Sequence, residues 1–182
     1  DHTGGLLTLR KALMVKNPKA LSRLHVGDGI FAPRYDEDGN AENNFPALAD
    51  AYRATGGQVI VHAGPAEIVP GAWLTGPVAR PHAETNWDAG LFVDSAGNRV
   101  PDNLHEDSSL VIPTAQGSVI VTGCGHAGIM NIADAAQAMT GNAPLLAVIG
   151  GVHLFAKPDV VLVETAARLK GLRYLLGGHC TG

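Results

Sequence analysis

The sequence has 182 residues, of which 46% are apolar and 16% are charged, so it can bury one sizeable core. The formal net charge of -4 and the lack of clustered lysines and arginines exclude nucleic acid as the main partner. No run of about 18 apolar residues and no charged start followed by an apolar stretch is present. Neither a membrane span nor a signal peptide is therefore visible in these residues, and we expect a cytoplasmic protein.

The first half predicts two helices and a strand, followed by loops. The leucines of "GGLLTLRKALMV" have helical spacing, and Pro18 follows the helix. The segment "NFPALADAYRATGG" predicts a second helix that leads into a buried strand, "QVIVH". From Ala63 to Asp107 the abundance of turn residues predicts hairpins and loops. Trp73 and Trp87 lie in this region, and packing onto the core is favoured over a role as the wall of a cleft.

The second half predicts an alternation of strands and helices. "SSLVIPTAQGSVIVTG" indicates two strands around a turn at Gln116–Gly117. "IMNIADAAQAMTG" and "KPDVVLVETAARLKG" predict helices, while "PLLAVIGG" and "LRYLLGG" predict strands. The order β-α-β-α-β is typical of an α/β protein with parallel strands.

Three of these strands are each followed by a glycine-containing loop and a histidine. "VIVTGCGH", "LLAVIGGVH" and "LRYLLGGH" end in His126, His153 and His179. Residues just past the carboxyl ends of parallel strands gather along one edge of the sheet, where ligands bind. Neutral imidazole is a good ligand for zinc or iron, so the repetition predicts a metal site at that edge.

The sequence opens on "DHTGG", which places a carboxylate and an imidazole at Asp1 and His2. "DHTGGL" resembles the second half of the H-x-H-x-D-H motif of the metallo-β-lactamase superfamily. "DNLHEDSSLVI", "VTGCGHAGIMN", "VIGGVHLF" and "GGHCTG" follow in the order of one branch, which is similar to the dihydropterin ribofuranosyl-aminobenzene phosphate synthase group. A flavodoxin-like domain with incidental histidines is the less favoured alternative.

The resemblance implies an α/β fold of the αβ/βα sandwich type with a metal site along one edge. It implies one domain over residues 1–182, incomplete at both ends, because the sequence begins inside the first motif and lacks the strands before it. Asp1, His2, His126 and His179 match family ligands. His153 stands where many members have a bridging aspartate, so it is either a ligand or a residue near the ligands.

The resemblance further implies one or two zinc ions, with iron or manganese as alternatives. We expect a hydrolase that uses metal-bound hydroxide on a small-molecule ester, phosphoester or related bond, with Asp1 orienting the hydroxide. The first alternative is a catalytically silent truncated domain that lacks the first two histidines. The second is a di-iron redox protein of the same fold. The expected partner is a small-molecule substrate, with neither nucleic acid nor membrane, and homo-oligomer formation is left open.

Further residues have weaker claims to the site. His62 lines a pocket or is an ordinary polar residue at a strand end, with neither favoured. The stretch His105–Asp107 is expected to be a solvated loop rather than a substrate contact. His25 and His82 have no constellation of other candidate site residues around them in the sequence.

The two cysteines, Cys124 and Cys180, each lie near a histidine. They are expected to stay unpaired, as reactive or weakly metal-binding groups or as small residues in tight loops.

Overall fold

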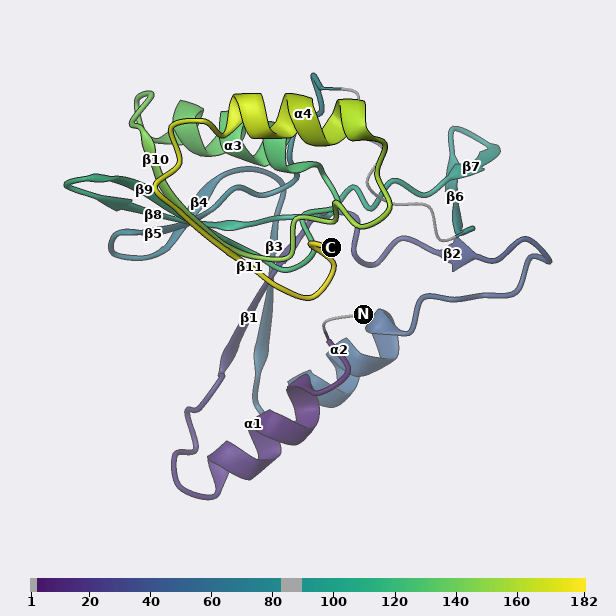
Figure 1. Ribbon diagram of the computed structural model, residues 1–182. Helices are drawn as coiled ribbons and strands as arrows, with labels where there is room; N and C mark the ends of the chain where they lie inside the picture. Colours follow the sequence, from purple (N-terminus) through teal and green to yellow (C-terminus); the bar gives the residue numbers. More distant parts are fainter. Residues whose placement is uncertain (1–2, 83–89) are drawn as a thin grey trace.

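The computed structural model describes residues 3–82 and 90–182 (Figure 1). In chain order its elements are α1 (Leu6–Met14), β1 (Arg23–Gly27), β2 (Arg34–Tyr35), α2 (Phe45–Arg53), β3 (Gln58–His62), β4 (Ala66–Val69), β5 (Ala72–Leu74), β6 (Phe92–Ser95), β7 (Asn98–Pro101), β8 (Leu110–Thr114), β9 (Gly117–Thr122), α3 (Ile129–Met139), β10 (Leu145–Gly150), α4 (Asp159–Arg168) and β11 (Tyr174–Gly177). None of the helices in these ranges combines the length and the apolar character needed to cross a membrane.

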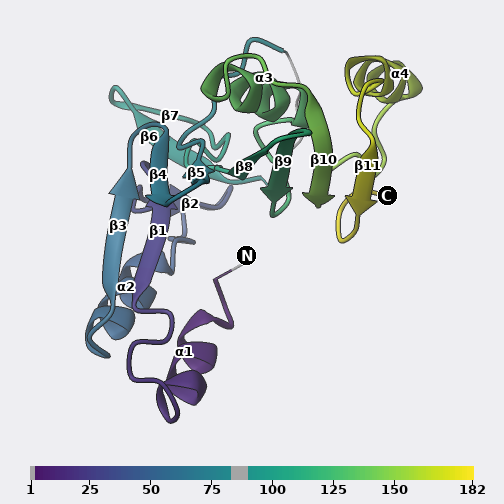
Figure 2. The same cartoon turned by 90° about the vertical axis from the view of Figure 1, so that its left-hand side faces the viewer.

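A six-stranded sheet organises the second half of the chain. Its strand order is β11-β10-β9-β8-β5-β4, and β9, β10 and β11 run parallel. Parallel neighbours need a crossover connection, which α3 and α4 supply. Both helices lie over the same face of the sheet, and the arrowheads of β9, β10 and β11 point the same way (Figure 2). The predicted β-α-β-α-β order is confirmed.

The main core lies between this sheet and α3. Val111 and Ile120 on the sheet and Ile132 on the helix are fully buried and belong to one apolar cluster. Trp73 packs against that cluster, as the sequence predicts. Trp87 lies outside the described residues.

A second, smaller unit of structure holds the first half of the chain. β1 and β3 pair in parallel, with His25 opposite Ile60 and Gly27 opposite His62. Below them in Figure 1 lie α1 and α2, and Val26, Phe45 and Ala49 form a second apolar cluster. A three-stranded sheet of order β2-β6-β7 completes the described elements.

Buried Arg10 ties α1 to the chain around α2. Its guanidinium donates hydrogen bonds to the Leu21 carbonyl at 2.9 Å and the Thr55 carbonyl at 2.9 Å, and its Nε donates to Thr55 Oγ1 at 2.6 Å. Tyr52 also donates its hydroxyl to the Leu21 carbonyl. Because several acceptors surround the charge, the arginine is buried without leaving its donors unsatisfied.

Two features of the structure differ from the prediction made from the sequence: β1 was not predicted, and one turn lies at a different position. β1 alternates polar and apolar side chains over only five residues, a run too short to predict a strand beside the stronger pattern of β3. The turn between β8 and β9 consists of Ala115 and Gln116, one residue earlier than expected, because Gly117 already pairs with Thr114.

Gly150, at the end of β10, lies against the backbone of β9. Its φ is 123°, and an added Cβ would lie 1.8 Å from the Thr122 carbonyl oxygen. No side chain fits there, so a glycine is required for β9 and β10 to end side by side.

We therefore expect Gly150→Ala to lower the free energy of unfolding by more than about 2 kcal/mol, because it combines a forbidden contact with a strained φ. Gly171→Ala is the matched control, since its Cβ would meet nothing within 4 Å. The free energy of unfolding of Gly171→Ala should stay unchanged or rise by up to about 1 kcal/mol. Urea unfolding followed by circular dichroism measures both, and equal effects would contradict this explanation.

Candidate metal centre

Three loops meet at the carboxyl ends of β9, β10 and β11. The Gly151 amide donates to the Gly123 carbonyl at 2.8 Å, which joins the loops after β9 and β10. The Gly178 amide donates to the Gly150 carbonyl at 3.3 Å, which joins the loops after β10 and β11. The loops that carry the three predicted histidines are therefore tied together through their backbones.

His126 and His153 lie side by side at this edge. Their ring centroids are 4.8 Å apart, and the rings meet edge to face at 68°. His126 is buried, and His153 is half-buried. Burial, followed by the charges of Lys157 and His179, lowers the pKa of His153 below its usual value. The neutral imidazole, which is the metal-binding form, is thus favoured at neutral pH.

The backbone is strained at two of the predicted ligands. His153 has a φ of 46° and His179 a φ of 55°, both in the left-handed region. For a residue other than glycine this conformation costs about 1–3 kcal/mol, and such residues concentrate at functional sites. His179 is exposed and close enough for its charge to affect His153. The strain fits a role for these loops that stability alone does not explain.

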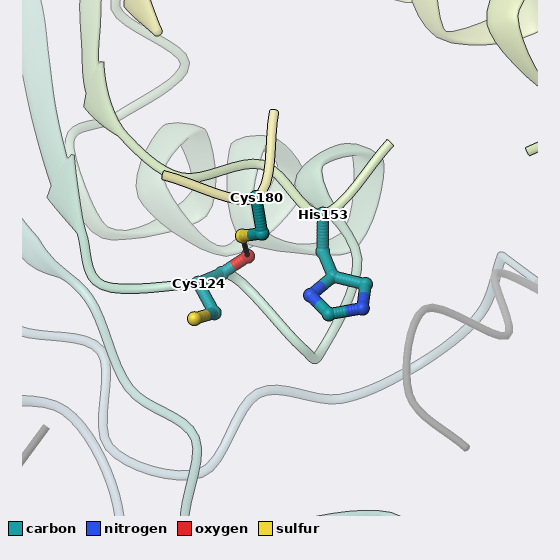
Figure 3. Close-up of side chains that lie close together, drawn as sticks. All are labelled: Cys124, His153 and Cys180. Carbon is teal, nitrogen blue, oxygen red and sulfur yellow. Dashed lines mark hydrogen bonds between the residues drawn. The ribbon is translucent and has the colours of Figure 1, made fainter. Parts of the chain in front are cut away.

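Two cysteines lie beside these histidines. The Sγ atoms of Cys124 and Cys180 and a ring nitrogen of His153 all lie within 4.8 Å of one another (Figure 3). Cys180 donates its thiol to the Cys124 carbonyl at 3.6 Å. Burial, helped by the neighbouring Cys180, raises the pKa of Cys124 to about 12. Both residues are thiols, as the sequence predicts.

The other two predicted ligands, Asp1 and His2, lie outside the described residues. Their roles, including that of Asp1 in orienting a hydroxide, stay predictions. Thr3 and Gly4, which follow them, line a cavity that also reaches Cys124 and His126.

This cavity has a volume of about 810 Å³ and lies between the two halves of the chain. Apolar side chains line part of it: Ile30, Phe45, Leu48, Leu91 and Leu104. Among the described residues, the charged side chains that line it are one arginine, Arg34, and three carboxylates, Glu42, Glu106 and Asp107. The cavity is large enough for a small molecule and has an excess of negative charge.

The stretch His105–Asp107 before β8 is solvated only at His105, which is exposed, whereas the two carboxylates do not match the solvated loop that the sequence predicts. Glu106 accepts a hydrogen bond from the Arg34 guanidinium at 2.6 Å, and its side chain is 15% exposed. Asp102 accepts from Arg34 Nε at 2.5 Å. Asp107 accepts from the Ala127 amide at 2.7 Å. The carboxylates are turned inward because each has a donor on a neighbouring loop, a pairing that sequence spacing does not reveal.

The loop that carries His126 is held from two sides. Asp107 binds the amide that follows His126, while Arg80 donates to the His126 carbonyl at 3.4 Å and to the Leu104 carbonyl at 3.0 Å. Burial lowers the pKa of Arg80, and the nearby carboxylates, Asp107 first, oppose that shift. These contacts fix the position of the His126 backbone, and sequence reasoning missed Arg80.

His25 and His62 form a pair, which corrects the expectation that His25 has no constellation around it. His25 Nδ1 and His62 Nε2 are 2.9 Å apart, and the rings stack with centroids 5.1 Å apart. Burial, His62 and Arg23 lower the pKa of His25. Because β1 was not predicted, nothing in the sequence placed the two histidines together.

His82 is likewise not isolated. Its Nε2 lies 2.8 Å from Asp134 Oδ2 on α3, and Asp134 also accepts from Arg168 Nε on α4 at 3.1 Å. The network joins the chain near residue 82 to two helices, and none of its three side chains lines the cavity. Its role is therefore assigned to stability.

Comparison with solved structures defines the class of fold. A solved structure described as a metal-dependent hydrolase of the β-lactamase superfamily matches with a TM-score of 0.71 and 25% identity. The match covers 88% of this chain and 60% of that one. The chain thus has the metallo-β-lactamase fold, and the α/β fold expected from the sequence is confirmed.

Two relatives with similar sequences indicate which branch of the superfamily the chain resembles. The 7,8-dihydropterin-6-methyl-4-(β-D-ribofuranosyl)-aminobenzene-5'-phosphate synthase of Methanocaldococcus jannaschii is 29% identical over 189 residues, which cover 100% of this chain and 63% of that protein. An uncharacterized protein of the same organism is 31% identical over 87 residues, covering 47% of this chain and 31% of its own length. The resemblance seen in the sequence motifs is confirmed. The chain spans less than two thirds of these relatives, and no family model matches it.

The network at Asp134 predicts a loss of stability in acid. Burial alone would raise the pKa of Asp134, but hydrogen bonds from Arg168 and His82 outweigh it and lower the pKa. A depressed carboxyl pKa stabilises the fold above the unfolded value of about 3.9, and this contribution is lost as the pH falls through the folded value. Asp134→Asn should therefore be destabilising at pH 6, with a difference from the parent that shrinks below about pH 4.

Asp50→Asn is the control, because the Asp50 side chain is 80% exposed and pairs with Arg53 alone on the helix surface. It should change the free energy of unfolding by at most about 0.5 kcal/mol at either pH. Urea unfolding at both pH values measures the difference. If the difference in free energy of unfolding between Asp134→Asn and the parent were the same at both pH values, the carboxylate charge would not be the cause of the destabilisation.

Proposed function

We propose that the chain carries a metal site of a hydrolase that acts on a small phosphorylated molecule. The ligands would be His126, His153 and His179, completed by Asp1 and His2 as the family resemblance implies. The observation that most supports the proposal is the approach of the His126 and His153 rings, at a strand-end edge that borders the cavity.

The donor set fits a transition metal. Imidazole nitrogen suits zinc, which we propose first, and iron, while manganese would depend on the carboxylate of Asp1. The two rings come from separate loops whose backbones are hydrogen-bonded together, so they need not be ordered by the metal. The metal-dependent hydrolase among the structural relatives supports a metal cofactor in the same fold.

When bound, the metal would supply a water of lowered pKa and polarise the bond to be cleaved. The chain's own residues would do the rest. Asp107 and Arg80 hold the His126 loop in place, and burial keeps His153 neutral and ready to bind. The apolar lining of the cavity would exclude water from the bound substrate.

The charges of the cavity bear on the substrate. Arg34 is neutralised by Asp102 and Glu106, so no lining arginine or lysine among the described residues is left to hold an anion. A phosphate group would therefore depend on the metal for its positive partner. The apolar side chains suit an aromatic or heterocyclic part of the same molecule. The compound in the name of the synthase relative has both an aromatic ring system and a 5'-phosphate on its ribofuranosyl group.

The first test is the metal content of the purified chain by elemental analysis, together with hydrolysis of bis(p-nitrophenyl) phosphate. We expect at least one bound ion and activity in the parent. His126→Ala should lower metal content and activity by at least about tenfold, since even residues that only orient ligands contribute about 10–100-fold.

His82→Ala is the matched control, because it removes an imidazole from outside the cavity. It should keep the metal content of the parent. Equal losses in the two variants would overturn the proposal, and so would a parent chain without metal above background. That last result would instead favour the catalytically silent domain.

A further inference from the structure

We propose a second, thiophilic metal site formed by Cys124, His153 and Cys180, which takes a soft ion such as zinc or copper(I). Its donor set differs from the imidazole and carboxylate set of the proposed hydrolase site, with which it shares only His153. The inference does not depend on that activity, because it rests on the positions of the two thiols.

The spacing of the three donor atoms suits one ion. Zinc binds sulfur at about 2.3 Å and imidazole nitrogen at about 2.0–2.1 Å, so two sulfurs on one ion are about 3.8 Å apart in a tetrahedral site and at most about 4.6 Å apart. The donor atoms of Cys124, His153 and Cys180 lie within 4.8 Å of one another. A sulfur and a nitrogen on one such ion are about 3.5–3.6 Å apart, so a contraction of about 1.3 Å at most, through side-chain rotation, brings the three donors to bonding distance of one ion.

The loops are built to bring these thiols together. Each donor follows a different strand, β9, β10 or β11, and Figure 3 shows the three side chains close together. The Phe155 amide donates to the Cys180 carbonyl at 3.3 Å, which fastens the last loop to the one that carries His153. Ordered loops reduce the entropy that binding must otherwise overcome.

Gly151 leaves the space that the two cysteines need. A Cβ there would lie 2.7 Å from Cys180 Sγ, 3.3 Å from Cys124 Cα and 2.6 Å from the Gly123 carbonyl oxygen. Its φ is outside the left-handed region, so backbone strain does not require a glycine at this position. The requirement is steric, and what a side chain would displace is the Cys180 thiol together with the Gly123 carbonyl.

The chemistry of the trio separates it from the imidazole site. Thiolate ligands select zinc and copper(I) over harder ions, whereas carboxylate and imidazole sets also accept manganese. Cys124 is buried but lines the cavity, so an ion has a path to it. His153 belongs to both donor sets. A metal ion bound at the thiol site would therefore remove one imidazole ligand from the proposed hydrolase site.

The test is a titration of the reduced full chain with Co²⁺, without oxygen, following the thiolate-to-cobalt charge-transfer band in the near ultraviolet. We expect the band in the parent at about one ion per chain. Cys180→Ser and Gly151→Ala should each weaken Co²⁺ binding at this band by at least about tenfold.

His126→Ala is the matched control and should keep the band, even where it loses metal and activity at the proposed hydrolase site. Cys180 is half-buried, so Cys180→Ser should keep the parent's circular dichroism, and it remains informative even if Cys124→Ser does not fold. A parent without the band, or a band unchanged in Cys180→Ser, would overturn the inference. Loss of activity in His126→Ala with the band intact would separate the two proposals.

Discussion

The close approach of three backbone loops is the constraint on which the rest of the site depends. β9, β10 and β11 end side by side, and glycines stand where these ends touch, because a Cβ on Gly150 would meet Thr122 and one on Gly151 would meet Gly123. The hydrogen bonds from Gly151 and Gly178 then lock the loops in register. Without this contact, the histidines and cysteines that follow the strands would be spread along the sheet edge instead of grouped at one place.

This constraint couples stability to function. Buried apolar contacts between the sheet and α3 fix where β9 and β10 end, and the loops beyond them hold strained residues such as His153 and a buried cysteine. Such features cost stability, and the surrounding packing must offset that cost. Arg80 and Asp107 add a second layer of support, since both bind the backbone beside His126.

The sequence predicted the second half of the fold well because each strand and helix there has a strong local pattern. The strand-histidine repeat also predicted correctly that His126 and His153 meet. The pairing of His25 with His62 and the salt bridges of Arg34 could not be predicted, since they depend on a short strand and on contacts between residues 37 to 72 positions apart. The roles of all five predicted ligands, Asp1, His2, His126, His153 and His179, and the extent of the domain, stay predictions.

The most direct measurement is an anomalous difference map from crystals of the chain soaked in zinc, with data collected on either side of the zinc absorption edge. The account predicts a peak at the carboxyl ends of β9, β10 and β11, within bonding distance of His153 and either His126 or the two cysteines. A peak confined to another part of the surface, or at the pair of His25 and His62, would contradict the claim that this edge of the sheet is the metal centre.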